Sequence, residues 1–143
     1  RTNITNTISG MKRLCGRNYD EPDVQTELAR YPFRTVRAPH GGVAITINYA
    51  GAEVNILAEH FLSMVLVYMH EVACTVNDQG ISEVVLAVPS HYTDLQRRSY
   101  LRACEAARLN CVKLVNEPAA VALEYGYYKA AKGLFHESKP ING

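Results

Sequence analysis

Residues 83–125 read EVVLAVPSHYTDLQRRSYLRACEAARLNCVKLVNEPAAVALEY, and the order of elements in this stretch decides the fold. Its apolar and helix-forming runs predict strand, helix, strand and helix in turn. Ligands of open α/β sheets bind outside the carboxyl ends of the strands. We therefore expect the chemistry at the two strand-to-helix turns, which carry Pro89, Ser90, His91, Thr93 and Asp94, and then Asn116, Glu117 and Pro118.

The helix of this stretch has a marked start and an inner face of small residues. Thr93-Asp94-Leu95-Gln96 has the capping-box pattern, in which the first and fourth side chains satisfy each other's free backbone N–H groups. We expect the two flanking strands to be parallel, with a right-handed crossover. Small side chains should allow the helix to approach the sheet closely, and they are Ala103, Cys104, Ala106 and Ala107.

A long helix and a meander are predicted before this stretch. The helix covers residues 58–77, with an apolar stripe at spacings of three and four formed by Phe61, Met64, Val65, Tyr68, Val72 and Val76. From Phe33 the chain becomes extended, and residues 43–49 alternate with the period of a half-buried strand. Turn residues at 39–42 and 50–51 bracket that strand, which predicts a small antiparallel meander.

Two short helices are predicted ahead of the meander, at Asn6–Gly16 and Asp20–Ala29. Asp20 is placed to cap the second helix, and Pro22 falls in its first turn, where a missing N–H costs little. We expect residues 1–69 and residues 70–143 to form two portions of one domain, with their boundary inside the long helix near Met69.

Composition excludes several classes of protein. The 143 residues are 48% hydrophobic and 20% charged, with a net charge of +1. Such a balance argues against a disordered chain and against charge-driven binding of nucleic acid. Spanning a bilayer takes about 20 apolar residues, whereas the apolar run from Leu57 to Val76 is interrupted by Glu59, His60, His70 and Glu71. We expect neither nucleic-acid nor membrane partners.

The cysteines and the chain ends suggest a piece of a cytoplasmic protein. Cys15, Cys74, Cys104 and Cys111 have no CxxC or metal-ligand spacing, so free thiols in a reducing compartment are expected. The first residues lack the apolar core of a signal peptide. Because the chain opens without methionine, we interpret it as an excised fragment.

Two segments together resemble a known family. The stretch 83–125 and the earlier segment Asn6–Arg17 (NTISGMKRLCGR), in that family's order, resemble the nucleotide-binding domain of the Hsp70 chaperone superfamily. The resemblance implies an α/β fold that is part of an actin/Hsp70-like (ribonuclease H-like) ATPase domain, first lobe only. Residues 1–69 would then belong to the upper subdomain of that lobe, and residues 70–143 would be the βαβα portion of the lower one.

The resemblance assigns nucleotide chemistry to three residues. Lys12, with Arg13 beside it, lies where the family's lysine reaches toward the phosphates and takes part in hydrolysis. Glu117, in Asn116-Glu117-Pro118, lies where a carboxylate stands near the magnesium shell and the attacking water. The implied cofactor is ATP or ADP with Mg²⁺, with no direct metal ligand from this chain. Without the resemblance, Lys12 and Arg13 would be a solvated helix face and Glu117 a first-turn carboxylate.

Three further residues match family positions that communicate with a substrate-binding domain: Pro89, Arg97 and Lys113. Without the resemblance, Pro89 would only end a strand and Arg97 would be a helix-surface charge. His91 departs from the family, which usually has an aromatic residue there, and this weakens the expectation of fast ATP hydrolysis. Two other motifs fail, because the Gly10–Arg17 segment lacks P-loop spacing and His70-Glu71 is followed by Cys74 where a zinc protease needs histidine.

The resemblance leaves three functions open. The chain is expected to come from an Hsp70-type chaperone that couples ATP hydrolysis to folding of protein clients with J-domain co-chaperones and exchange factors. The first alternative is an Hsp110-type nucleotide exchange factor for Hsp70, toward which the tail Gly126–Pro140 and the run Ala120–Leu123 point. The second is an actin-like or sugar-kinase ATPase. The chain lacks the family's glycine-rich phosphate loops, so by itself it should bind Mg-ATP weakly and not hydrolyse it.

Overall fold

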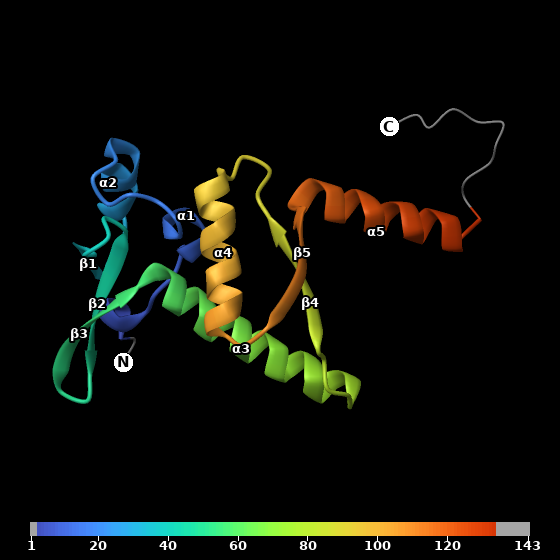
Figure 1. The fold of residues 1–143 in the computed structure, drawn as a ribbon, viewed down its shortest axis with the longest axis horizontal. Coiled ribbons are helices and arrows are strands. Elements are labelled where there is room, and N and C mark those ends of the chain that lie inside the picture. The colour runs from blue at the N-terminus through green and yellow to red at the C-terminus, as the bar shows by residue number, and fades with distance from the viewer. Residues whose placement is uncertain (1–2, 134–143) are drawn as a thin grey trace.

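The computed structural model describes residues 3–133 and shows an elongated α/β molecule (Figure 1). The last part of the tail on which the Hsp110 alternative rests, residues 134–140, lies outside the described residues. The elements in chain order are η1 (Ile4–Asn6), α1 (Met11–Leu14), α2 (Pro22–Leu28), β1 (Arg34–Arg37), β2 (Val43–Tyr49), β3 (Ala52–Leu57), α3 (Ala58–Asn77), β4 (Glu83–Val88), α4 (Asp94–Ala106), β5 (Asn110–Asn116) and α5 (Glu117–Ala131).

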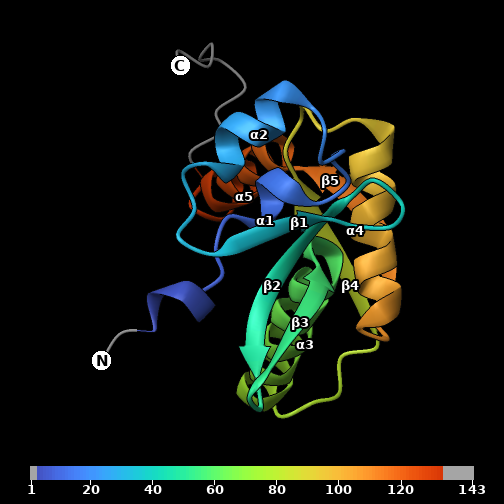
Figure 2. The same ribbon diagram turned by 90° about the vertical axis from the view of Figure 1, so that its left-hand side faces the viewer.

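The predicted meander is confirmed. Strands β1, β2 and β3 form an antiparallel sheet in sequence order, seen face-on in Figure 2. The predicted half-buried alternation of β2 is wrong for its first half, where Val43, Ala44, Ile45 and Thr46 are all buried. Both faces tolerate burial there because Ala44 is small and the Thr46 hydroxyl donates to Asn55 Oδ1 at 2.7 Å.

Both early helices are shorter than predicted. Helix α1 covers only Met11–Leu14, because Gly10 and Gly16 on either side adopt positive φ angles of 73° and 70°. Helix α2 begins at Pro22, as expected for a proline at the first position. Asp20 does not cap it, since the N-cap residue is Glu21, and the Asp20 carboxylate instead accepts a hydrogen bond from Arg37 Nε at 2.8 Å.

Helix α3 has the predicted bounds but buries a different face. Its buried residues are Ala58, Leu62, Ser63 and Leu66. Of the predicted stripe, only Phe61 packs against the core, and the exposed members are Met64, Val65, Tyr68, Val72 and Val76. The helix carries apolar side chains on more than one face, so periodicity could not select the buried one. The predicted division at residues 69/70 falls within this continuous helix.

Strands β4 and β5 pair in parallel, as predicted, with α4 between them in sequence. Thr93 and Gln96 form both bonds of the capping box at the start of α4. The expected inner face of small residues is confirmed for Ala103, Cys104 and Ala107, but Ala106 is exposed. Because Ala106 lies only two residues beyond Cys104, it is turned away from the buried face by the helical rotation.

Helix α4 lies at the centre of the molecule, with α1 and the meander on one side and the β4–β5 pair on the other (Figure 1). A single buried cluster joins the two portions, with Leu14, Val24 and Ile45 from the early part and Val88, Tyr100 and Ala103 from the later part. Helix α5 extends away and contains no buried residue. None of the helices within residues 3–133 has the length and apolar character needed to cross a membrane.

Candidate functional site

Lys12 and Glu117, two residues predicted to share a site, form an ion pair although 105 positions separate them. Lys12 comes from α1, and Glu117 is the first residue of α5, directly after β5. Their side chains are 58% and 36% exposed, so the pair lies on an open edge. An ammonium and a carboxylate thus converge, accessible to solvent, at the carboxyl end of the parallel strands.

The Glu117 carboxylate is held where a helix N-terminus favours negative charge. Asn116 is the N-cap residue of α5, and Pro118 fills a first-turn position where no N–H is needed. The Asn116 side chain makes no capping bond. Its Oδ1 instead accepts a hydrogen bond from Arg97 of α4.

Arg97 of α4 connects the two strand-to-helix turns. Its Nη2 donates to Asn116 Oδ1 at 2.9 Å, and its Nε donates to the Tyr92 carbonyl at 3.2 Å. The same Nη2 lies 3.4 Å from the Ser90 carbonyl. A predicted switch residue is therefore hydrogen-bonded to the neighbour of Glu117 and is more than a helix-surface charge.

Tyr92 holds the main chain of Lys12 in place. The Tyr92 hydroxyl donates to the Lys12 main-chain carbonyl, and the hydroxyls of Tyr92 and Tyr100 lie 3.1 Å apart. Burial raises the pKa of Tyr92 above its ordinary value of 10.0, so the hydroxyl stays protonated and able to donate. No local sequence pattern indicates this role, because Tyr92 and Lys12 are 80 positions apart.

Arg13 does not join the Lys12–Glu117 pair. Its Nη1 bonds to Glu27 Oε1 at 2.7 Å, and the Tyr31 hydroxyl donates to the same oxygen at 2.9 Å. These hydrogen bonds, that from Arg13 first, lower the pKa of Glu27. Arg13 therefore ties α1 to α2, and Glu27 is a partner that the sequence did not reveal.

The other predicted residues at these turns lie at varying distances from the pair. Pro89 follows β4, and its carbonyl accepts from the Tyr92 N–H at 3.2 Å. His91 is exposed and contacts the edge of the Tyr92 ring. Lys113 is exposed on β5 opposite Val85 and makes no ion pair within residues 3–133. The structure thus brings Arg97 to the turns but does not join Lys113 to it.

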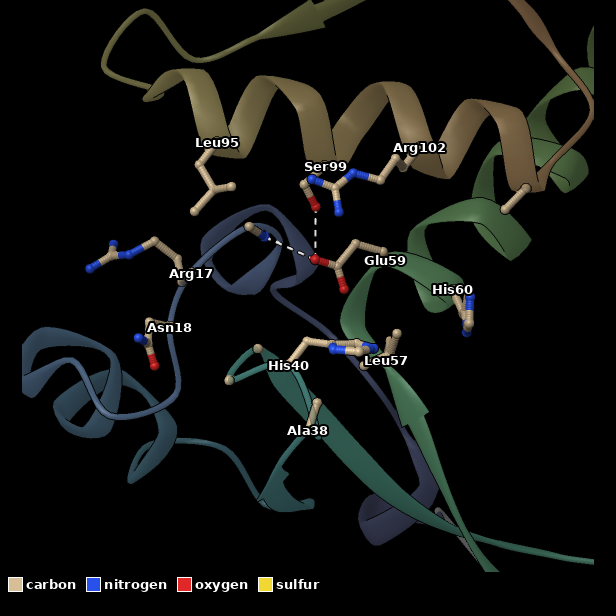
Figure 3. Close-up of a pocket in the computed structure, with 14 residues that line it drawn as sticks. Arg17, Asn18, Ala38, His40, Leu57, Glu59, His60, Leu95, Ser99 and Arg102 are labelled. Carbon is tan, nitrogen blue, oxygen red and sulfur yellow. Dashed lines mark hydrogen bonds between the residues drawn. The ribbon is translucent and has the colours of Figure 1, made fainter.

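A pocket of about 310 Å³ opens between the meander and α4, apart from the Lys12–Glu117 edge (Figure 3). Glu59, at the start of α3, points into it, and its Oε1 accepts from the Gly16 N–H at 3.1 Å and from Ser99 Oγ at 2.8 Å. In the sequence, Glu59 stands out only as a charge that interrupts an apolar run. No local pattern could have revealed partners 43 and 40 residues away.

The described residues bring together two charged groups of the kind that phosphate chemistry uses. Lys12 offers a positive charge on a long stem, and Glu117 offers one carboxylate. No group of three or more His, Cys, Asp or Glu side chains suited to a metal ion occurs within residues 3–133. The Lys12 ammonium suits a phosphate contact, and the Glu117 carboxylate suits a place near Mg²⁺, an ion that binds proteins through one or two carboxylates and keeps several of its waters.

Comparison with known proteins gives one consistent result. The family described as "Hsp70 protein" matches residues 1–138. The chain is 39% identical over 128 residues to "Heat shock 70 kDa protein 4L" of Homo sapiens, covering 90% of this chain and 15% of that protein. It is 39% identical over 141 residues to "Heat shock 70 kDa protein 4" of Rattus norvegicus, covering 99% of this chain and 17% of that protein.

"Heat shock protein 110" of Caenorhabditis elegans is 36% identical over 130 residues, which cover 90% of this chain and 17% of that protein. The chain therefore spans about a sixth of the length of these relatives. Because the family match covers nearly all of the chain, it decides against the actin-like or sugar-kinase alternative. The chain belongs to the Hsp70 superfamily of heat shock chaperones, and its α/β fold is part of the actin/Hsp70-like ATPase domain of that family.

Proposed function

We propose that this chain forms one wall of the ATP site of a chaperone that couples ATP binding and hydrolysis to the folding of protein clients. The observation that carries the proposal is the ion pair between Lys12 and Glu117, which joins the two segments on which the family resemblance rests. Phosphoryl transfer is catalysed mainly by positioning and charge stabilisation. A lysine and a carboxylate meeting at an open edge supply both.

In this proposal Lys12 contacts the phosphates of ATP, and Glu117 lies near the water shell of Mg²⁺. The bound ion would neutralise charge that develops on the phosphate oxygens. Lys12 Nζ orients the nucleotide by donating hydrogen bonds, while Glu117 Oε1 holds Lys12 in place until the nucleotide arrives. Arg13 contributes indirectly, because its bond to Glu27 anchors α1 against α2.

Arg97, Pro89 and Lys113 are proposed to transmit nucleotide state toward a substrate-binding domain. The support for Arg97 is its bond to Asn116, which precedes Glu117. The proposed partners are unfolded clients, J-domain proteins, and Hsp70 or its exchange factors. The proposed location is the cytoplasm, since all four cysteines are free, as expected in a reducing compartment.

The test is single-turnover ATP hydrolysis by the full-length gene product and by Lys12→Ala. We expect the substitution to slow hydrolysis roughly a hundredfold or more, as removal of one preorganised donor does elsewhere. Lys129→Ala, which removes a lysine from α5, is the matched control and should hydrolyse ATP at the unsubstituted rate. Equal rates in all three proteins would overturn the role of Lys12.

A second candidate function is nucleotide exchange for Hsp70 with little hydrolysis. The observation that favours it is the 36% identity to a relative named "Heat shock protein 110". Tight ATP binding with almost no turnover in both the unsubstituted protein and Lys12→Ala would select this function. Accelerated release of ADP from a separate Hsp70 would then be the positive assay.

We also propose that the 143-residue chain alone does not hydrolyse ATP. It supplies one wall of the site, so its affinity for Mg-ATP should be no better than on the order of millimolar, a binding free energy near −4 kcal/mol. Calorimetric titration measures this directly. An affinity in the micromolar range would show that the chain forms a complete site.

A further inference from the structure

The C-terminal end of α1 lacks the hydrogen bond that would continue the helix. An α-helix would next join the Gly16 N–H to the Lys12 carbonyl. Instead, the Gly16 N–H donates to Glu59 Oε1 at 3.1 Å, and the Lys12 carbonyl accepts from the Tyr92 hydroxyl. Both groups of the missing bond are thus satisfied by side chains from other elements, α3 and the turn before α4.

We propose that Tyr92 and Glu59 are positioning residues that set the Lys12 ammonium against Glu117. The inference rests on the proposed function only where it holds that this placement of the Lys12 ammonium serves ATP hydrolysis. Lys12 is two residues from Gly10 and four from Gly16, both with positive φ, so local backbone geometry does not continue the helix in either direction. Tertiary hydrogen bonds, together with the burial of Leu14, therefore hold α1 in its orientation.

Glu59 and Tyr92 bind the segment of α1 from two elements, α3 and the turn before α4, and a further hydrogen bond joins α3 to α4. Glu59 Oε1 also accepts from Ser99 Oγ at 2.8 Å, so the same oxygen links α3, α4 and Gly16, two residues beyond α1 (Figure 3). Ser99 is 2% exposed, which shields this bond from competing water.

Tyr92 is equally constrained. The residue is 6% exposed, and its ring packs edge-on against that of Tyr100, with ring centroids 5.3 Å apart. A hydroxyl has one proton, and Tyr92 gives its proton to the Lys12 carbonyl, so Tyr100 donates in the pair of hydroxyls. The bond to Lys12 consequently survives loss of the Tyr100 hydroxyl.

The segment after α1 is closely packed at Gly16. A Cβ at this position would lie 2.6 Å from Gln96 Cα and 3.0 Å from the Leu95 carbonyl oxygen of α4. The backbone after α1 therefore passes directly against α4, within reach of Glu59.

The test uses the full-length gene product and a zero-length carbodiimide crosslink between Lys12 and Glu117. The reagent activates the Glu117 carboxylate, the Lys12 amine attacks it to form an amide, and the reagent leaves as a urea. Mass spectrometry then measures the yield of the linked peptides. We expect Tyr92→Phe, which keeps the ring, and Glu59→Ala to lower the yield about fivefold, the factor that one average hydrogen bond confers.

Two variants serve as matched controls. Tyr100→Phe removes a neighbouring hydroxyl but keeps the bond to Lys12, and Glu59→Gln keeps an amide oxygen that accepts from Gly16 and Ser99. Both should retain the unsubstituted yield. Equal loss in Tyr100→Phe and Tyr92→Phe, or no loss in Tyr92→Phe, would overturn the role of Tyr92. Equal loss in Glu59→Gln and Glu59→Ala would overturn that of Glu59.

Single-turnover hydrolysis of the same variants separates this inference from the proposed function. Tyr92→Phe should slow hydrolysis by about the same fivefold factor and leave ATP affinity unchanged, which a general loss of structure would not do. If the variants change the crosslink yield as expected but the unsubstituted protein does not hydrolyse ATP, the proposed function is overturned and the positioning inference stands. Absence of the crosslink in the unsubstituted protein overturns the positioning inference.

Discussion

At the scale of single residues, burial divides the four cysteines into two classes. Cys15 and Cys104 are 0% and 1% exposed, whereas Cys74 and Cys111 are half-buried. Burial, assisted by Glu59, raises the pKa of the Cys15 thiol to about 12. Burial and the neighbouring Cys111 raise the pKa of Cys104 to about 12 as well.

We expect iodoacetamide at pH 8 to alkylate Cys15 and Cys104 more than about tenfold more slowly than Cys74 and Cys111, because the thiolate is the reacting form. Peptide mass spectrometry over time measures the four rates. Alkylation in urea provides the control, since unfolding should make the rates similar. Fast alkylation of Cys15 in the folded chain would contradict the burial of its thiol.

Glu27 gives the chain an acid-sensitive contact. Its hydrogen bonds with Arg13 and Tyr31 lower its pKa below the ordinary value of 4.5. The contribution of Glu27 to the free energy of unfolding is therefore fully present above pH 4.5 and is lost as the pH falls through the lowered folded pKa.

In urea unfolding between pH 7 and pH 3, we expect Glu27→Gln to reduce stability at neutral pH and to flatten its decline in acid. Glu53→Gln, which removes an exposed carboxylate on β3, is the matched control. The same acid profile for Glu27→Gln and the unsubstituted chain would show that the contact is not formed in solution.

Gly16 is required by its backbone and by its neighbours. Its φ is 70°, and a methyl group added to its Cα would lie within 3.0 Å of backbone atoms of α4, so Gly16→Ala should lower the free energy of unfolding by about 1–3 kcal/mol. Gly80→Ala, which would meet nothing within 4 Å, should change it by no more than about 0.5 kcal/mol. Urea denaturation of the two variants measures the difference, and equal stabilities would contradict the close approach.

At the scale of elements, the capping box is the local signal that marks the start of α4. Thr93 Oγ1 accepts from the Gln96 N–H, and the Gln96 side chain accepts from the Thr93 N–H at 3.1 Å. Thr93→Ala should therefore lower the free energy of unfolding by about 1 kcal/mol. Thr93→Ser keeps the cap and should lower it less. Urea denaturation decides, and equal losses in the two variants would assign the effect to the threonine methyl group.

The bounds of helix α3 could be predicted from the sequence, but its buried face could not. Its bounds follow from the apolar period and the terminal turn residues, and the structure confirms them. Its buried face was predicted wrongly, because Leu62 and Leu66 lie beside equally apolar residues such as Val65 and Tyr68. Only the elements that pack on a helix determine which of two apolar faces is buried.

At the scale of the whole molecule, one face of the β4–β5 pair carries apolar side chains that residues 3–133 leave exposed. Leu86 and Val88 pack in or against the core, whereas Val85 on β4 and Val112 on β5 are 54% and 52% exposed. Exposed apolar surface beside strand edges favours association between chains.

We expect light scattering to show association of the 143-residue chain that increases with concentration. The double variant Val85→Thr and Val112→Thr, which keeps β-branched side chains, should associate less. Val54→Thr on β3 is the matched control and should associate as the unsubstituted chain does. A clean monomer at high concentration would contradict this prediction.

The α/β class, the parallel strand pair, the capped start of α4 and the long helix could all be predicted from the amino-acid sequence. It also indicated Lys12 and Glu117 as members of one site through a family resemblance. These features depend on periods and on neighbours within a few residues, where backbone geometry is decided locally. Helix α1 was predicted too long, because the positive φ angles at Gly10 and Gly16 that bound it depend on tertiary packing. The cap of α2 was also predicted wrongly, because the choice of Glu21 over Asp20 depends on that packing as well.

The contacts that hold Lys12 and Glu117 together could not be predicted from the sequence, because they depend on how distant segments pack. The bonds of Glu59 to Gly16, of Tyr92 to Lys12 and of Glu117 to Lys12 join residues 43, 80 and 105 positions apart. A hydrogen bond requires donor and acceptor within about 3 Å and in good alignment, and residue type alone does not specify that geometry. The path of the whole chain around α4 brings these groups together.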